Sequence, residues 1–188
     1  MLRIQLGKLK NKKLNFDQKT RPTESKIVLS IYNSLINSDF VFDGISVLDL
    51  YSGSGVLGLT AISLGAAELV SIDTSNYNIK QINLFSKQNN LNGISAYQKQ
   101  IDLDNIETIF KLINKKEFNL IFADPPYTIT DYSKIFKTYI NLLQYKGRLI
   151  IRLDKNSDIS ELLSYLDNSA LFYKIYQYSN TRVLIIIK

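Results

Sequence analysis

From residue 45 to residue 166 the sequence alternates short apolar runs with longer segments of helical spacing. The apolar runs lie at 45–51, 68–73, 94–99, 118–124 and 148–153, and the helical segments at 55–64, 75–90, 104–115, 131–143 and 157–166. Because βαβ units place successive strands parallel, with helices over the sheet faces, this order predicts an α/β fold with a parallel sheet covered on both sides. Residues 171–188 break the pattern. Two strand-like runs follow each other there with only Ser179 and Asn180 at the joint, which predicts an antiparallel hairpin at one edge of the sheet.

The first 26 residues carry the excess positive charge of the chain. They hold eight basic and two acidic residues, whereas the remaining residues, 15 basic and 15 acidic, are neutral as a set. Apolar and polar residues alternate at 2–6 and 12–16, which predicts a small basic hairpin, and helical spacing follows at 26–35. Clustered Lys and Arg gain affinity for polyanions by releasing counterions from phosphates, so this arm favours a nucleic acid as partner; a solvated tail is the alternative. We expect residues 1–22 to form the arm and residues 23–188 a single domain.

Histidine and cysteine are both absent from the 188 residues. Their absence excludes disulfides, thiolate metal sites, cysteine nucleophiles and imidazole bases, and it argues against a zinc or iron centre, because carboxylates alone suit magnesium or calcium better. No apolar run reaches the length of about 18 residues that a membrane span needs, and the basic N-terminus lacks the apolar segment of a secretory signal. We therefore expect a cytoplasmic, monomeric protein without a metal site.

A glycine-rich loop follows the first predicted strand. Residues 47–58 read VLDLYSGSGVLG, in which Gly53, Gly55 and Gly58 form a G-x-G-x-x-G pattern. Such a loop binds a dinucleotide when the pyrophosphate sits on the N-terminus of the next helix. The first two glycines would let the backbone approach a ligand closely, and Gly58 is expected to ease the packing of helix on strand. A tight turn without a ligand is the structural alternative.

Two carboxylates decide between possible ligands for this loop. Asp49 lies inside the strand, where its charge would repel a pyrophosphate but could receive an ammonium group, directly or through water. Asp73, at the end of the second strand, can accept hydrogen bonds from ribose hydroxyls of either kind of ligand. S-adenosylmethionine carries an amino-acid end and a sulfonium but no phosphate. The sequence therefore favours S-adenosylmethionine over NAD.

A second motif, FADPPYT, follows the fourth apolar run. Ligands of open α/β sheets bind beyond the carboxyl ends of the strands, and this is where the run delivers Asp124, Pro125, Pro126 and Tyr127. Asp124 and a backbone carbonyl held by the rigid prolines could accept the two hydrogens of an exocyclic amino group, while Tyr127 stacks on the ring. Methyl transfer to such an amine needs positioning more than a strong base, so a chain without histidine could perform it. A surface turn is the alternative.

Together with GKLKNKKL and RPTESK near the N-terminus, these motifs resemble the bacterial methyltransferases of the ribosomal RNA small subunit methyltransferase D family, over nearly the whole chain. That resemblance implies a Rossmann-like seven-stranded sheet and methylation of a guanine N2 in 16S ribosomal RNA. By the same resemblance the catalytic residues would be Asp124, Pro125, Pro126 and Tyr127, and the residues in contact with S-adenosylmethionine would be Asp49, Ser52, Gly53, Ser54, Gly55 and Asp73.

Several positions depart from the family pattern. Asn11 stands where a second hairpin glycine is usual, and we expect it to adopt the left-handed conformation that Asn tolerates. Asp73 replaces the commoner glutamate. Lys146 and Gly147 take the place of a double glycine, and Arg152 falls where an acidic residue often ends the fifth strand.

Further contacts are assigned by position. Asp102, or in another register Asp104, would meet the adenine amino group after the third strand. The expected contacts with RNA are Arg3, Lys8, Lys10, Lys12, Lys13, Arg21 and Thr23, which would position the RNA without reading its sequence. The segment 21–23 could instead fold over the cofactor.

The sequence thus predicts an S-adenosylmethionine-dependent enzyme that methylates a guanine N2 of small-subunit rRNA, either as naked rRNA or within an assembly intermediate. The target base would have to be unpaired or flipped out of its stack. The alternatives are a DNA adenine or cytosine amino-methyltransferase, a protein glutamine methyltransferase, a non-catalytic RNA-binding protein of the same fold, and an NAD-dependent reductase.

Overall fold

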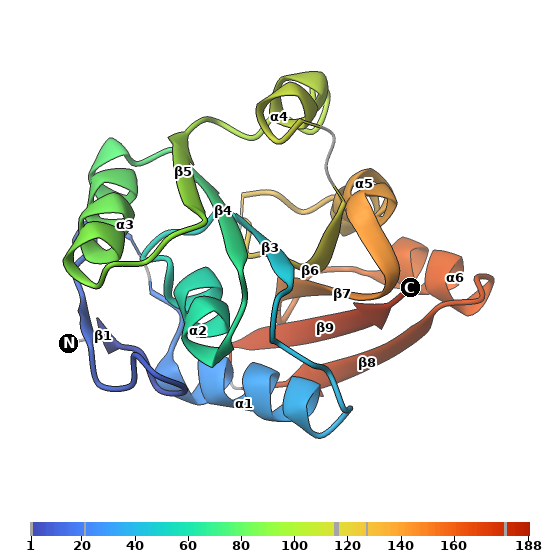
Figure 1. Ribbon diagram of the computed structural model, residues 1–188. Coiled ribbons are helices and arrows are strands. Elements are labelled where there is room, and N and C mark those ends of the chain that lie inside the picture. Colours follow the sequence, from blue (N-terminus) through green and yellow to red (C-terminus); the bar gives the residue numbers. More distant parts are fainter. Residues whose placement is uncertain (1, 21, 115–116, 127, 179) are drawn as a thin grey trace. The chain divides into compact units, whose positions relative to one another are not determined.

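Figure 1 presents the computed structural model, which describes residues 2–20, 22–114, 117–126, 128–178 and 180–188. The chain forms two compact units, Met1–Gln100 and Ile101–Lys188, and each unit is described by itself. Among the described residues the main-sheet strands number seven, three in the first unit and four in the second, as predicted.

The first unit contains the parallel strands β3 (Ser46–Leu50), β4 (Glu68–Asp73) and β5 (Ile94–Gln98), in the spatial order β5-β4-β3. All five residues of β3 are buried, as expected for a strand covered on both faces. Helix α2 (Val56–Leu64) contacts β3 and β4, and α3 (Asn76–Gln88) contacts β4 and β5. Because α2 is apolar nearly all round, it is buried at every position from Val56 to Ser63.

The N-terminal hairpin is part of this first unit. Its strands are shorter than predicted, β1 (Leu2–Arg3) and β2 (Lys13–Leu14), and they pair antiparallel. The Ser63 hydroxyl at the end of α2 accepts a hydrogen bond from the Leu9 amide at 2.8 Å and donates one to the Leu6 carbonyl at 2.5 Å. The basic arm is therefore anchored on the end of α2. Helix α1 (Ser25–Ile36) follows it, with Glu24 at the N-cap.

The second unit holds β6 (Phe118–Ala123), β7 (Leu143–Asp154), β8 (Phe172–Gln177) and β9 (Thr181–Ile187) in the order β6-β7-β9-β8. Strands β6 and β7 are parallel, whereas β9 pairs antiparallel with β7 and β8. The predicted hairpin at the sheet edge is thereby confirmed. The helices are α4 (Glu107–Leu112), α5 (Tyr132–Tyr139), the short 3-10 helix η1 (Ile140–Leu142) and α6 (Ser160–Asp167).

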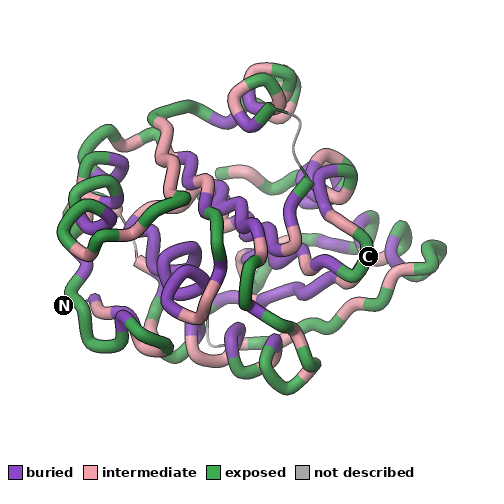
Figure 2. The backbone as a smooth tube through the Cα atoms, viewed as in Figure 1, coloured by how far each residue is buried: buried purple, intermediate pink, exposed green. Residues whose placement is uncertain are grey.

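The predicted limits of β3, β4, β5 and β6 agree with the structure to within one residue, whereas β7 begins at Leu143 and is longer than the predicted 148–153. Figure 2 shows the buried residues following the central strands, while the outer faces of the helices are exposed. Helix α4 is shorter than the predicted 104–115, because a turn closed by Asp102 occupies its first residues: the Asp102 side chain accepts from the Asp104 amide at 2.9 Å. Within the described part of the chain, no helix is long and apolar enough to cross a membrane.

Candidate cofactor and catalytic sites

The loop between β3 and α2 follows a path that most residue types avoid. Gly53 and Gly55 have positive φ angles of 51° and 73°, and so does Tyr51, with φ 58°. The Ser52 amide donates to the Ile72 carbonyl at 3.0 Å, which ties the loop to the end of β4. A non-glycine residue in the left-handed region costs about 1–3 kcal/mol and is found mostly at functional sites. The sequence pattern identified the glycines of this loop, but it contained no signal for the conformation of Tyr51.

Asp49 lies beneath this loop, with 1% of its surface exposed. Its Oδ2 accepts a hydrogen bond at 2.9 Å from the amide of Gly58, in the first turn of α2. A side chain at Gly58 would prevent this packing, because a Cβ there would come within 2.9 Å of Asp49 Oδ2 and 2.5 Å of Leu69 Cδ1. The predicted role of Gly58 in the packing of helix on strand is confirmed.

The position of Asp49 changes the electrostatics of the α2 N-terminus. A helix N-terminus carries about +0.5 of an elementary charge and commonly binds phosphate, but here a full negative charge is already hydrogen-bonded to it. The field at this end of α2 is therefore net negative and favours a cationic ligand over a phosphate. Because the carboxylate is buried, the geometry favours an indirect effect of Asp49 on a ligand. Asp49 would act through its electric field and through the α2 backbone to which it is hydrogen-bonded.

Tyr32 of α1 also lies in this electrostatic environment. Its hydroxyl is fully buried and donates to the Leu57 carbonyl at 2.5 Å. Burial, and then the negative charge of Asp49, raise the pKa of Tyr32 well above its ordinary value, so that it stays neutral. The sequence gave no reason to single out this tyrosine.

The Asp73 side chain connects the loop that follows β3 with the residues that follow β4. Its Oδ2 accepts from the Gly53 amide at 2.8 Å, and its Oδ1 accepts from the Ser75 amide at 2.8 Å and from Asn78 Nδ2 at 3.4 Å. The structure thus brings Asp73 and the glycine loop together, as the parallel strand order predicts. A carboxylate offers about four lone-pair sites, so these bonds are compatible with a further contact to ribose.

A segment between the hairpin and α1 lies against the same loop. The methyl group of Thr20 would lie 3.1 Å from a Cβ placed on Gly53, and its Oγ1 accepts from Asn78 Nδ2 at 2.9 Å. Asn78 is 1% exposed, and its Oδ1 accepts from the Asp17 amide at 2.8 Å. Sequence reasoning missed these residues because the contacts span about 60 positions. The one available signal was the polar Asn78 on the largely apolar inner face of α3.

The residues predicted to contact RNA divide by exposure. Asn11 has a φ of 70°, which confirms the expected left-handed turn, and its carbonyl accepts from Arg3 Nη1 at 2.7 Å. Thr23 is buried at 5% exposure, and Arg21 lies outside the described residues. Of the predicted RNA contacts on the hairpin, Lys8, Lys10, Lys12 and Lys13 are exposed.

In the second unit, Asp124 directly follows β6 and is partly exposed, whereas Pro125 is buried and Pro126 exposed. The Pro126 carbonyl accepts from the Ile129 amide at 2.9 Å and closes a turn. Tyr127 lies outside the described residues.

The carboxylate of Asp124 forms an ion pair with Arg152 of β7. Arg152 Nη1 donates to Asp124 Oδ2 at 2.7 Å, and the two side chains are 7% and 18% exposed, respectively. The strand register explains the contact, because Ala123 pairs with Ile151 and the next residue on each strand is therefore a neighbour of the other. Sequence analysis had singled out Arg152 only as a departure from the family pattern.

Comparisons with known proteins show the family of this chain. A family model described as Conserved hypothetical protein 95 matches residues 2–179. The chain belongs to this family. One similar protein is the ribosomal RNA small subunit methyltransferase D of Buchnera aphidicola, 30% identical over 149 residues that cover 74% of this chain and 68% of that protein.

Solved structures similar to this family member show its fold. One, named "Putative methyltransferase yhhF" from Escherichia coli, has a TM-score of 0.78 at 17% identity and covers 100% of this chain and 97% of that one. Another, of the protein SMU.776 complexed with SAH, has a TM-score of 0.66 at 18% identity and covers 85% of this chain and 48% of that one. The predicted fold, a Rossmann-like α/β methyltransferase fold, is therefore confirmed.

The two candidates for an adenine contact have other partners in the structure. Asp102 is exposed, and its side chain closes the turn before α4. The Asp104 carboxylate forms an ion pair with Lys134. Neither arrangement decides between the two registers, so the assignment of Asp102 stays a prediction.

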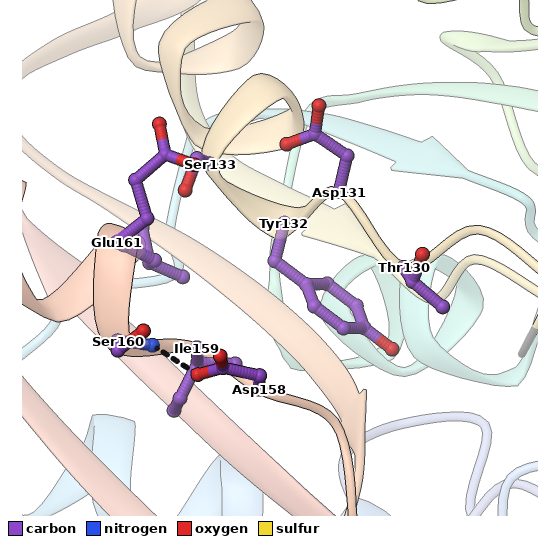
Figure 3. A pocket seen from close by; sticks show the side chains of 9 residues that line it. Thr130, Asp131, Tyr132, Ser133, Asp158, Ile159, Ser160 and Glu161 are labelled. Carbon is purple, nitrogen blue, oxygen red and sulfur yellow. Dashed lines mark hydrogen bonds between the residues drawn. The ribbon is translucent and has the colours of Figure 1, made fainter.

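Figure 3 shows a cavity of the second unit that lies between the first turns of α5 and α6. Two of its acidic side chains accept hydrogen bonds from backbone amides at the starts of these helices. Asp131 accepts from the Lys134 amide at 2.8 Å, and Asp158 accepts from the Ser160 amide at 2.9 Å. The hydrogen bonds from Ser160, first from its backbone, lower the pKa of Asp158. Across the described ranges of the chain, no group of three or more His, Cys, Asp or Glu residues could hold a metal ion.

Proposed function

We propose that this chain is an S-adenosylmethionine-dependent methyltransferase of ribosomal RNA, and that its acceptor is the exocyclic N2 of a guanine in 16S rRNA. The observation that carries the proposal is the carboxylate of Asp49, hydrogen-bonded to the α2 N-terminus at 2.9 Å, because a negative charge there favours a cationic ligand at this loop. The name of the Buchnera relative supports rRNA as the class of substrate.

The residues of the first unit fit S-adenosylmethionine. The loop residues Ser52, Gly53, Ser54 and Gly55 would hold its amino-acid end, and Asp73 would accept hydrogen bonds from the ribose. When bound, this cofactor supplies an electrophilic methyl group on a sulfonium. The negative field of Asp49 would stabilise that positive charge.

The DPPY loop of the second unit would hold the base. The Asp124 carboxylate would accept one amino hydrogen of guanine and a backbone carbonyl the other. Because the Pro126 carbonyl already closes a turn with the Ile129 amide, we assign this acceptor to Pro125. Tyr127 would stack on the guanine ring, and the exposed lysines of the hairpin would bind phosphates.

Methyl transfer to purified substrates tests the proposal and separates it from its rivals. Labelled S-adenosylmethionine should transfer its methyl group to 16S rRNA, offered both naked and within small-subunit particles, but not to duplex DNA or to a glutamine-containing protein. Mass spectrometry of nucleosides from the product should show N2-methylguanosine. Asp124→Ala should abolish transfer and leave RNA binding nearly unchanged. Retention of activity in this variant, or a methyl group at another atom, would contradict the proposed chemistry.

A further inference from the structure

Arg152 is a buried cation near the C-terminal end of β7. Its side chain is 7% exposed, and its neighbours Ile151 and Leu153 are fully buried. A guanidinium removed from water is tolerated only where it is paired and hydrogen-bonded. The pairing found here is with the one carboxylate to which the proposed function assigns the acceptor amine.

The ion pair also has a geometry suited to holding the Asp124 side chain in one orientation. The backbone of Arg152 pairs with Val183 of β9, and the residue before it, Ile151, pairs with Ala123 of β6, so the strand is held on both sides next to the ion pair. Asp124 lies where β6 ends and the loop begins. A rigid strand residue thus holds the side chain of a loop residue through a contact of 2.7 Å.

We propose that Arg152 is a positioning residue for methyl transfer, a role that rests on the proposed function of Asp124. The guanidinium holds the Asp124 carboxylate in one rotamer, with its oxygens presented as hydrogen-bond acceptors. One contact with Arg152 leaves capacity for an amine N–H, since a carboxylate offers about four lone-pair sites. Fixing the acceptor before the base arrives places the amine for attack on the methyl group and speeds the chemical step.

The test compares Arg152→Met and Arg152→Lys with a matched control on the same strand, Arg148→Met. The Arg148 guanidinium donates to the carbonyls of Lys146 and Gly147, and its removal leaves Asp124 untouched. For each protein kcat, the KM for RNA, the affinity for S-adenosylhomocysteine and the unfolding temperature are measured.

Arg152→Met should lower kcat by about 10- to 100-fold, because a misplaced reacting group costs rates of this order. Its KM for RNA and its affinity for S-adenosylhomocysteine should stay within about threefold of wild type. Arg152→Lys should recover part of the lost kcat, and Arg148→Met should behave as wild type. A kcat of Arg152→Met within about twofold of wild type would overturn the role of Arg152.

A double-mutant cycle separates positioning from a general structural effect. Asp124→Asn keeps an acceptor oxygen but removes the charge that Arg152 binds. In that background Arg152→Met should lower kcat by less than about threefold, since the pair is already broken. An undiminished loss in that background would overturn the proposal. If Arg152→Met does not fold, Arg152→Lys decides: an unchanged kcat overturns the proposal, and a reduced kcat with unchanged affinities supports it.

These outcomes remain distinguishable from failure of the proposed function. Transfer by the wild-type protein to a different acceptor would overturn the guanine assignment, and the Arg152 series would then be measured on that acceptor. No methyl transfer by the wild-type protein to any acceptor would overturn both proposals.

Discussion

Replacing Asp49 by Asn removes the negative charge at the N-terminus of α2 and little else. The side chains have nearly the same shape, and the Asn oxygen can still accept from the Gly58 amide, now 2.9 Å from the carboxylate. A unit charge acting on a cation about 8 Å away contributes about 2 kcal/mol at an effective dielectric constant near 20. A loss of this size weakens binding of the cationic cofactor by about 30-fold.

The assay uses the difference in charge between the cofactor and the product that methyl transfer leaves. S-adenosylmethionine carries a positive sulfonium, whereas S-adenosylhomocysteine has a neutral thioether and is otherwise the same molecule. Titration calorimetry of the Asp49→Asn protein should therefore show a larger loss of affinity for S-adenosylmethionine than for S-adenosylhomocysteine. The control is Asp39→Asn, an exposed carboxylate of the same unit whose φ of 55° Asn tolerates equally. Equal losses for both ligands, or none, would refute the electrostatic role of Asp49.

Three further changes test other parts of the structure. Gly58→Ala should destabilise the protein by about 1–3 kcal/mol through overpacking, seen as an unfolding temperature lower by several degrees. Lys10→Gln with Lys12→Gln should weaken RNA binding on all sequences and reduce the slope of log affinity against log salt by about one for each contact removed. Asp158→Ala should flatten the acid limb of the stability curve. Hydrogen bonds from Ser160 lower the pKa of Asp158 below its ordinary value of 3.8, so its contribution is present above that value and is lost as pH falls through the folded pKa.

The first two of these changes have a matched comparison. Gly44→Ala meets no atom within 4 Å but has a φ of 74°, so it carries only the backbone strain; a Gly58→Ala protein as stable as this one would contradict the packing argument. Lys80→Gln with Lys87→Gln removes two exposed charges from α3 instead of the hairpin. An equal loss of RNA affinity in that pair would deny the hairpin a special role. Unchanged acid unfolding in Asp158→Ala would contradict the assigned pKa shift.

Local pattern sufficed for most of the architecture. The strand Glu68–Asp73 was predicted with its observed limits, because a short apolar run between turn residues has few alternatives. Helix α4 was predicted, but its shorter length was not, since the turn closed by Asp102 competes with the helix for the same backbone groups. In the candidate site, too, local pattern identified some residues and missed others. Gly53 and Asp73 could be identified from their places after successive strands, but not the position of Asn78 between Asp73 and Thr20.

The sequence by itself determined the order of strands and helices, the glycine loop, the DPPY loop and the location of the excess charge, because periodicity, glycine content and net charge are properties of neighbouring residues. Only the tertiary structure decided which groups the charged side chains of the candidate sites contact. Asp49 meets the first turn of α2, and Asp124 meets Arg152, through packing and strand register that join residues 9 and 28 positions apart. Register is a collective property of a whole sheet, and a shift by one residue would turn Arg152 to the opposite face.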